Sequence, residues 1–273
     1  GKAYFDEEQM NLLWIPIIGL LLLATQYYVN YRPFLVNKLV IDGMSIGQYA
    51  QTMPFPDAVK RQQNAFTSAI AMNTLGSEEA REQYLQMGVR MSQIKLPDET
   101  PAADKQAALL AINGLVQSVR DDVKVSFESH KEDVRMLSIY GMFYNGTGDA
   151  KSGEEILTLA RTFAPKKQLI GFDLTRSYLI QGKYKEAYNL SKEIYELSFT
   201  CTDASKWYLL SAAYAGSYKA ARAEVEKNGQ KVAFDQDVLS AVVSTGQTTL
   251  AIELLQEVKK TNPEYGSQVD QYI

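Results

Sequence analysis

Four glycines recur along the C-terminal half of the chain at a nearly constant interval. They stand 34, 34 and 30 residues apart, at Gly148, Gly182, Gly216 and Gly246. A small residue follows each of them by five positions: Gly153, Ala187, Ala221 and Ala251. Around Gly182, apolar residues recur at helical spacing on both sides, which predicts two amphipathic helices joined by a glycine turn. Such a pair cannot bury both apolar faces alone, so the chain should stack several pairs.

The order of residues within one period resembles the tetratricopeptide (TPR) repeat, in which Tyr, Gly, Ala and Pro follow one another over about 34 residues. The tyrosines at this spacing are Tyr144 and Tyr178, and the prolines are Pro165 and Pro263. The resemblance implies four TPR-like helical repeats over residues 132–266, with a tail at 267–273. The first helix of each repeat would line a concave groove.

Seven residues face that groove when they are placed by the glycine register. They are Arg135, Met142, Phe172, Arg176, Lys206, Leu210 and Tyr214. The three cations would form a basic stripe beside aromatic side chains, which suits an acidic peptide end or an anionic glycan. Packing between helices is the alternative interpretation for the many tyrosines of this region.

The N-terminal part carries a long apolar run from Leu12 to Val29, interrupted by Thr25 and Gln26. At about 1.5 Å per residue the run extends ~27 Å, close to a bilayer core. We expect a transmembrane helix over residues 10–31, after a juxtamembrane segment at 1–9, and hence a lipid bilayer as one partner. A signal peptide and a buried helix are the alternatives, but Asp6, Glu7 and Glu8 do not suit a signal peptide.

Residues 32–131 should form a helical region that includes a divergent TPR-like hairpin. No alternating β-branched run is long enough for a sheet, so we expect an all-α chain: one N-terminal transmembrane helix followed by a TPR-like α-helical repeat solenoid.

The sequence contains no strong motif for catalysis, metal binding or nucleic-acid binding. The net charge of −4 gives no nucleic-acid footprint. A single cysteine, Cys201, and a single histidine, His130, exclude an intramolecular disulfide and a multi-histidine metal site. The stretch from Asn145 to Ser152 lacks the glycine spacing of a phosphate-binding loop. We therefore predict no catalytic residue, no cofactor and no metal site in these residues.

Three stretches carry a more specific resemblance. The apolar helix runs into YVNYRPFLVNKLVIDGM, NAFTSAIAMNTLGSEEAREQYLQ follows, and helical repeats come after. Together they resemble the C-terminal part of bacterial O-antigen ligase/polymerase-like membrane proteins, with residues 12–86 carrying most of the likeness. The resemblance implies a parent glycosyltransferase with many membrane helices that acts on lipid-linked glycans, and it places the repeats outside the cytoplasm.

Three functions remain open at this point. The first is a membrane-anchored, non-catalytic TPR-like scaffold that binds a protein or peptide beside cell-envelope glycan assembly. The second places the function in a polytopic parent enzyme, of which this chain is the C-terminal module. The third is a stand-alone anchored adaptor of an envelope or secretion complex.

Overall fold

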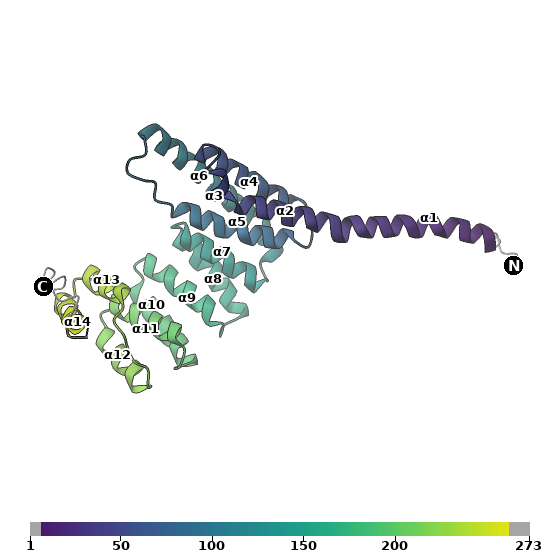
Figure 1. Cartoon of the computed structure of the whole chain (residues 1–273). Helices are drawn as coiled ribbons and strands as arrows, with labels where there is room; N and C mark the ends of the chain where they lie inside the picture. The colour runs from purple at the N-terminus through teal and green to yellow at the C-terminus, as the bar shows by residue number, and fades with distance from the viewer. Residues whose placement is uncertain (1–6, 262–273) are drawn as a thin grey trace. The chain divides into compact units, whose positions relative to one another are not determined.

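The computed structural model describes residues 7–261, with side chains from Trp14 onward. It is all-α: 79% of the structure is helical, and the described residues form no strand. The predicted tail at 267–273 and most of the predicted segment at 1–9 lie outside the described residues. The chain divides into two compact units, Gly1–Phe127 and Glu128–Ile273 (Figure 1).

The first unit contains a short π-helix and six α-helices, the last of which continues to His130. In chain order they are α1 Glu7–Thr25, π-helix η1 Gln26–Tyr31, α2 Arg32–Met44, α3 Ile46–Tyr49, α4 Phe55–Ala71, α5 Ser77–Ser92 and α6 Ala102–His130. Helices α2, α4 and α5 pack together around Phe66, whose ring stacks on Tyr84 with centroids 5.4 Å apart. At Gly43 an added Cβ would lie 2.7 Å from the Phe66 ring, so this glycine lets α2 approach α4 closely.

No helix in the described part of the chain is long and apolar enough to cross a membrane. The prediction of a transmembrane helix over residues 10–31, and of a single-span membrane localisation, is therefore wrong. The physical reason lies in the length of the run: the uninterrupted apolar stretch from Leu12 to Ala24 covers only about 20 Å, roughly two thirds of a bilayer core. After Thr25 the backbone changes to the π-helix, where Gln26 accepts a hydrogen bond from Asn30 at 2.8 Å.

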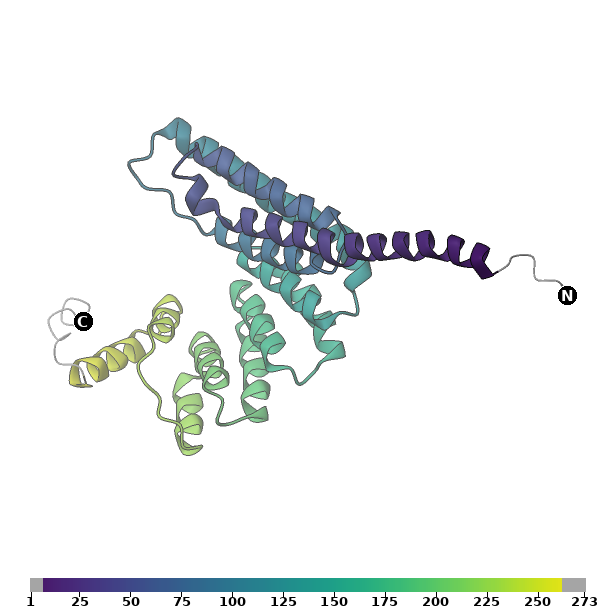
Figure 2. The same ribbon diagram turned by 45° about the vertical axis from the view of Figure 1, so that its right-hand side comes forward.

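The second unit begins after residue 127, and its described residues form eight helices. The helices follow one another in pairs (Figure 2). They are α7 Val134–Gly146, α8 Ala150–Phe163, α9 Gln168–Ile180, α10 Tyr184–Leu197, α11 Thr202–Tyr214, α12 Tyr218–Lys227, α13 Gln236–Ser244 and α14 Thr248–Thr261. Helices α7 and α9, α9 and α11, and α11 and α13 are in contact. We call α7, α9, α11 and α13 the first helices, and α8, α10, α12 and α14 the second helices.

The periodic glycines close the turns between first and second helices. Gly148, Gly182, Gly216 and Gly246 have φ values of +84°, +72°, +72° and +73°. Residues with a Cβ rarely adopt this left-handed conformation, so the prediction that glycine supplies the turn geometry is confirmed. Asp133 and Asp149 cap α7 and α8 by accepting backbone N–H groups.

Small residues bring the paired helices close together. An added Cβ at Gly141 of α7 would lie 2.3 Å from Leu157 Cγ of α8, and one at Gly171 of α9 would lie 2.4 Å from Ile194 Cδ1 of α10. Ala187 and Ala221, two of the small residues that follow the glycines, are fully buried. Each pair therefore has a tightly packed seam.

Ion pairs connect successive second helices. Arg161 of α8 pairs with Glu193 of α10 at 2.5 Å, and Lys192 of α10 pairs with Glu224 of α12 at 3.7 Å. Arg222 of α12 contacts both oxygens of the Glu257 carboxylate in α14, each at 2.7 Å. We call these three contacts the ion-pair ladder. All of them join residues about one sequence period apart.

Candidate functional site

The seven predicted groove residues occupy one side of three first helices. Phe172 and Arg176 are four residues apart on α9, and Lys206, Leu210 and Tyr214 follow one another at the same spacing on α11, so each set lies on one side of its helix. The other side of α9 carries Gly171, which faces α10. We call the side defined by these residues, together with Arg135 and Met142 on α7, the first-helix face.

Exposure differs among the predicted residues. Arg135, Met142, Arg176 and Lys206 are exposed, whereas Phe172, Leu210 and Tyr214 are half-buried. Met142 retains 46% of its surface. The face therefore presents apolar and basic side chains together.

Aromatic stacking joins neighbouring helices at this face. Phe172 of α9 stacks on Trp207 of α11, with centroids 6.4 Å apart and the rings 14° from parallel. Tyr214 stacks on Tyr184 at the start of α10, with centroids 5.0 Å apart. The sequence register did not select Trp207, although its position directly after Lys206 was a usable signal. Trp207 is half-buried and belongs to the candidate site.

The three predicted cations are not equivalent. The Lys206 ammonium lies 3.5 Å from Asp235 and 3.3 Å from Asp237, and the pKa of Lys206 is raised, first by the charge of Asp235 and then by the hydrogen bond to Asp237. The two carboxylates offset its charge. Arg176, in contrast, has neither a hydrogen bond nor an ion pair from its guanidinium in the described part of the chain.

Asp173 was not among the predicted site residues, and it lies one helical turn before Arg176. Burial raises the pKa of its carboxyl group to about 6, and the charge of Arg176 opposes this rise in part. Its Oδ2 is buried without a hydrogen-bond partner. The sequence signal was an acid three residues before a predicted groove cation, but no pattern indicates that a neighbouring helix covers it.

A buried polar link holds α7 to α9 beneath Asp173. The Asn145 side chain donates to the Asp173 carbonyl oxygen at 2.9 Å, and its Oδ1 accepts from the Ser177 hydroxyl at 2.8 Å. Asn145 retains only 4% of its surface. Although Asn145 begins an Asn-Gly-Thr sequence, glycosylation of the folded protein at this residue would break the link, so the asparagine is structural.

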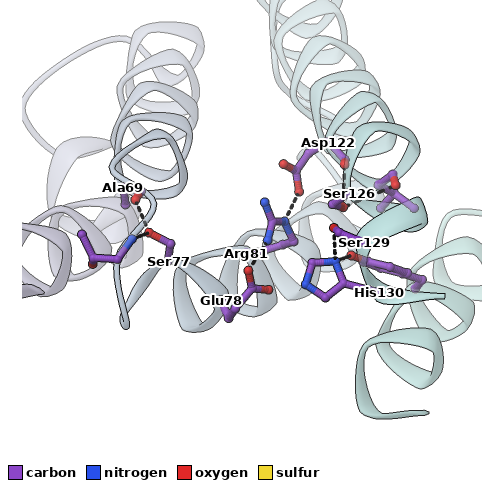
Figure 3. Close-up of polar contacts among 11 residues, drawn as sticks. Ala69, Ser77, Glu78, Arg81, Asp122, Ser126, Ser129 and His130 are labelled. Atoms are coloured by element: carbon purple, nitrogen blue, oxygen red, sulfur yellow. Dashed lines mark hydrogen bonds and ion pairs between the residues drawn. The ribbon is translucent and has the colours of Figure 1, made fainter. Parts of the chain in front are cut away.

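Arg81 and His130 make further contacts between polar side chains. In the first unit, Arg81 pairs with Glu78 at 2.7 Å and with Asp122 at 2.8 Å, which ties α5 to α6 (Figure 3). His130 Nδ1 lies 3.1 Å from the Ser129 hydroxyl and 3.3 Å from the Tyr140 hydroxyl.

Glu154 and Cys201 lie in the second unit. Glu154, one of two adjacent acids, is bound by Lys183 at 2.5 Å and Gln181 at 2.7 Å. Cys201 is a half-buried free thiol just before α11. Among the described residues, no group of His, Cys, Asp and Glu side chains could hold a metal ion.

Searches against protein-family models, curated proteins and solved structures find no match to this chain.

Proposed function

We propose that the second unit is a TPR-like repeat domain that binds a segment of a protein partner along the first-helix face. The observation that carries the proposal is Arg176, a guanidinium without an ion pair beside the stacked pair of Phe172 and Trp207. Elsewhere in the unit, arginines such as Arg161 and Arg222 are paired with carboxylates. An exposed guanidinium next to aromatic side chains favours a partner with an acidic group and an apolar side chain.

The helix arrangement supports an elongated partner rather than a small molecule. Successive first helices α7, α9 and α11 are in contact, and each carries one of the large apolar residues Met142, Phe172 and Leu210 on the first-helix face. A surface that extends across three helices suits an extended peptide or one side of a partner helix. The acidic group would bind at Arg176, with Arg135 on the adjacent helix as a second contact.

We further propose that the chain serves as a non-catalytic scaffold in the assembly of cell-envelope glycans. Support comes from the resemblance of residues 12–86 to the C-terminal part of O-antigen ligase/polymerase-like proteins and from the structural role of the charged clusters described above. In this proposal, any glycosyl transfer belongs to other parts of a longer parent protein, and a lipid-linked glycan would reach this chain only through that parent.

Peptide binding tests the proposal directly. Peptides recovered by panning a random library against the whole chain should be rich in acidic and apolar residues. The Arg176→Ala variant should bind them about tenfold more weakly, because it loses a charge-assisted hydrogen bond. Arg161→Ala, on a second helix, is the matched control and should bind as the unchanged protein does. Equal binding by both variants, measured by fluorescence polarisation, would refute the proposed face.

A further inference from the structure

Asp173 places a negative charge on a face that, in the proposed function, attracts acids. It is three residues before Arg176 on α9, so the two side chains are neighbours on the helix surface. The ionised carboxylate offsets part of the attraction of Arg176 for an anion. Since Oδ2 is buried without a hydrogen bond, the protein does little to stabilise that ionised form.

Several other charged residues lie on the helices that contact α9. Four helices pack against α9: α7, α8, α10 and α11. Their charged residues are Arg135; Lys151, Glu154, Glu155 and Arg161; Lys185, Glu186, Lys192, Glu193 and Glu196; and Asp203 and Lys206. Among all of these and the charges of α9 itself, Arg176 is the one charge that shifts the pKa of Asp173, which it lowers against the larger rise caused by burial. Asp173 and Arg176 therefore act as a pair.

We propose that protonation of Asp173 controls how strongly Arg176 attracts the acidic group of a bound partner. The inference rests on the proposed function of the first-helix face. When Asp173 is ionised, its negative charge offsets part of the positive charge of Arg176, so Arg176 attracts the acidic group of the ligand less strongly. When Asp173 takes up a proton, that competition ends and the ligand acid receives the full attraction.

Linkage makes the effect reciprocal. A bound carboxylate draws on the charge of Arg176 and adds a second negative charge near Asp173, so binding favours the protonated form of Asp173. Partner binding should then be coupled to proton uptake. The pKa of free Asp173 is about 6, which places the change between mildly acidic and neutral pH.

The pairing can be tested without any ligand. The Arg176 side-chain Nε–H resonance, assigned by its loss in Arg176→Lys, should shift with pH around a midpoint near 6 in the whole chain. The shift should disappear in Asp173→Asn and persist in His130→Gln, which removes the histidine, the other kind of side chain that titrates in this range. A resonance that does not move between pH 5 and 8, or one that still titrates in Asp173→Asn, would overturn the inference.

Binding of the panned acidic peptides supplies the second readout. The unchanged protein should bind them about fivefold more tightly at pH 5.0 than at pH 7.5. Asp173→Asn should bind equally at both pH values, whereas Asp203→Asn, an exposed acid on α11, should keep the difference. A pH difference that survives in Asp173→Asn overturns the inference alone. Failure of the unchanged protein to bind acidic peptides at either pH overturns the proposed function as well.

Discussion

The first and second helices of the C-terminal unit use their charged side chains differently. The second helices pair their charges with one another: Arg161, Lys192 and Arg222 each contact a carboxylate of the next second helix. The first helices expose apolar side chains, leave Arg176 without an ion pair and place Asp173 where ionisation is disfavoured. The second helices use their charges to hold the unit together. The first helices keep two polar groups, the Arg176 guanidinium and the Asp173 carboxyl, that a partner can satisfy.

The largest expected effect concerns the seam between the two rows. Gly141→Ala should destabilise the protein by about 2 kcal/mol, because the new Cβ would meet the branched Cγ of Leu157, which is fully buried and has little room to move. Gly171→Ala is the matched variant. Its Cβ would meet the flexible end of Ile194, and the gain in helix propensity offsets part of the strain. In urea unfolding, the free energy of unfolding of Gly141→Ala should be well below that of Gly171→Ala. The reverse order would contradict the close packing of Gly141 against Leu157.

Asp173→Asn should stabilise the protein at neutral pH. The folded-state pKa of about 6 lies above the ordinary 3.8, so folding carries a cost that is absent below pH 3.8 and complete above pH 6. Two pKa units correspond to at most about 3 kcal/mol, and partial exposure reduces the expected gain to about 1 kcal/mol. Urea unfolding should show this gain at pH 7.5 and only about a third of it at pH 4.5. A constant gain at both values would point to packing instead of charge.

Arg222→Ala tests whether the ion-pair ladder contributes to stability. Its guanidinium binds Glu257 through two nitrogens and Glu226 through a third, and it lowers the pKa of Glu257. We expect a loss of about 0.5–1 kcal/mol in low salt, the usual range for a well-aligned surface pair, and a smaller loss in 1 M NaCl. Unfolding curves at the two salt concentrations measure it, and a loss that does not depend on salt would assign the effect to packing of the arginine stem.

The smallest effect on stability should come from Arg176→Ala. Because Arg176 is exposed and has no ion pair, the free energy of unfolding should change by less than about 0.5 kcal/mol. Its effect should instead appear in peptide binding, as described above. A loss of stability as large as that of Arg222→Ala would erase the distinction between the two rows of helices.

Local periodicity predicted much of this structure. The spacing of the four glycines located the turns, because a left-handed backbone position restricts residue choice strongly. The apolar run at the N-terminus was misread, because composition alone did not show where the regular helix ends near Thr25. Hydrophobicity averaged over a window of residues does not detect a change from α-helix to π-helix within that window.

The candidate site was predictable only in part. The register placed Arg176 and Phe172 on one side of α9, since positions on a helix face recur with the period. It could not find the burial of Asp173 or the two carboxylates on Lys206, because each depends on which side chain a neighbouring helix brings near. The charge state and the ion pairs of a side chain depend on which residues contact it in the folded protein. Sequence spacing specifies such contacts only within a single helix.

The ion-pair ladder also bears on how the C-terminal unit folds. Each of its contacts spans one helix pair, as do the contacts between successive first helices. A set of interactions confined to neighbours keeps loop-closure entropy small and the contact order low. Folding can then begin at any well-formed pair and spread in either direction, so a damaged pair at one end leaves the others able to form.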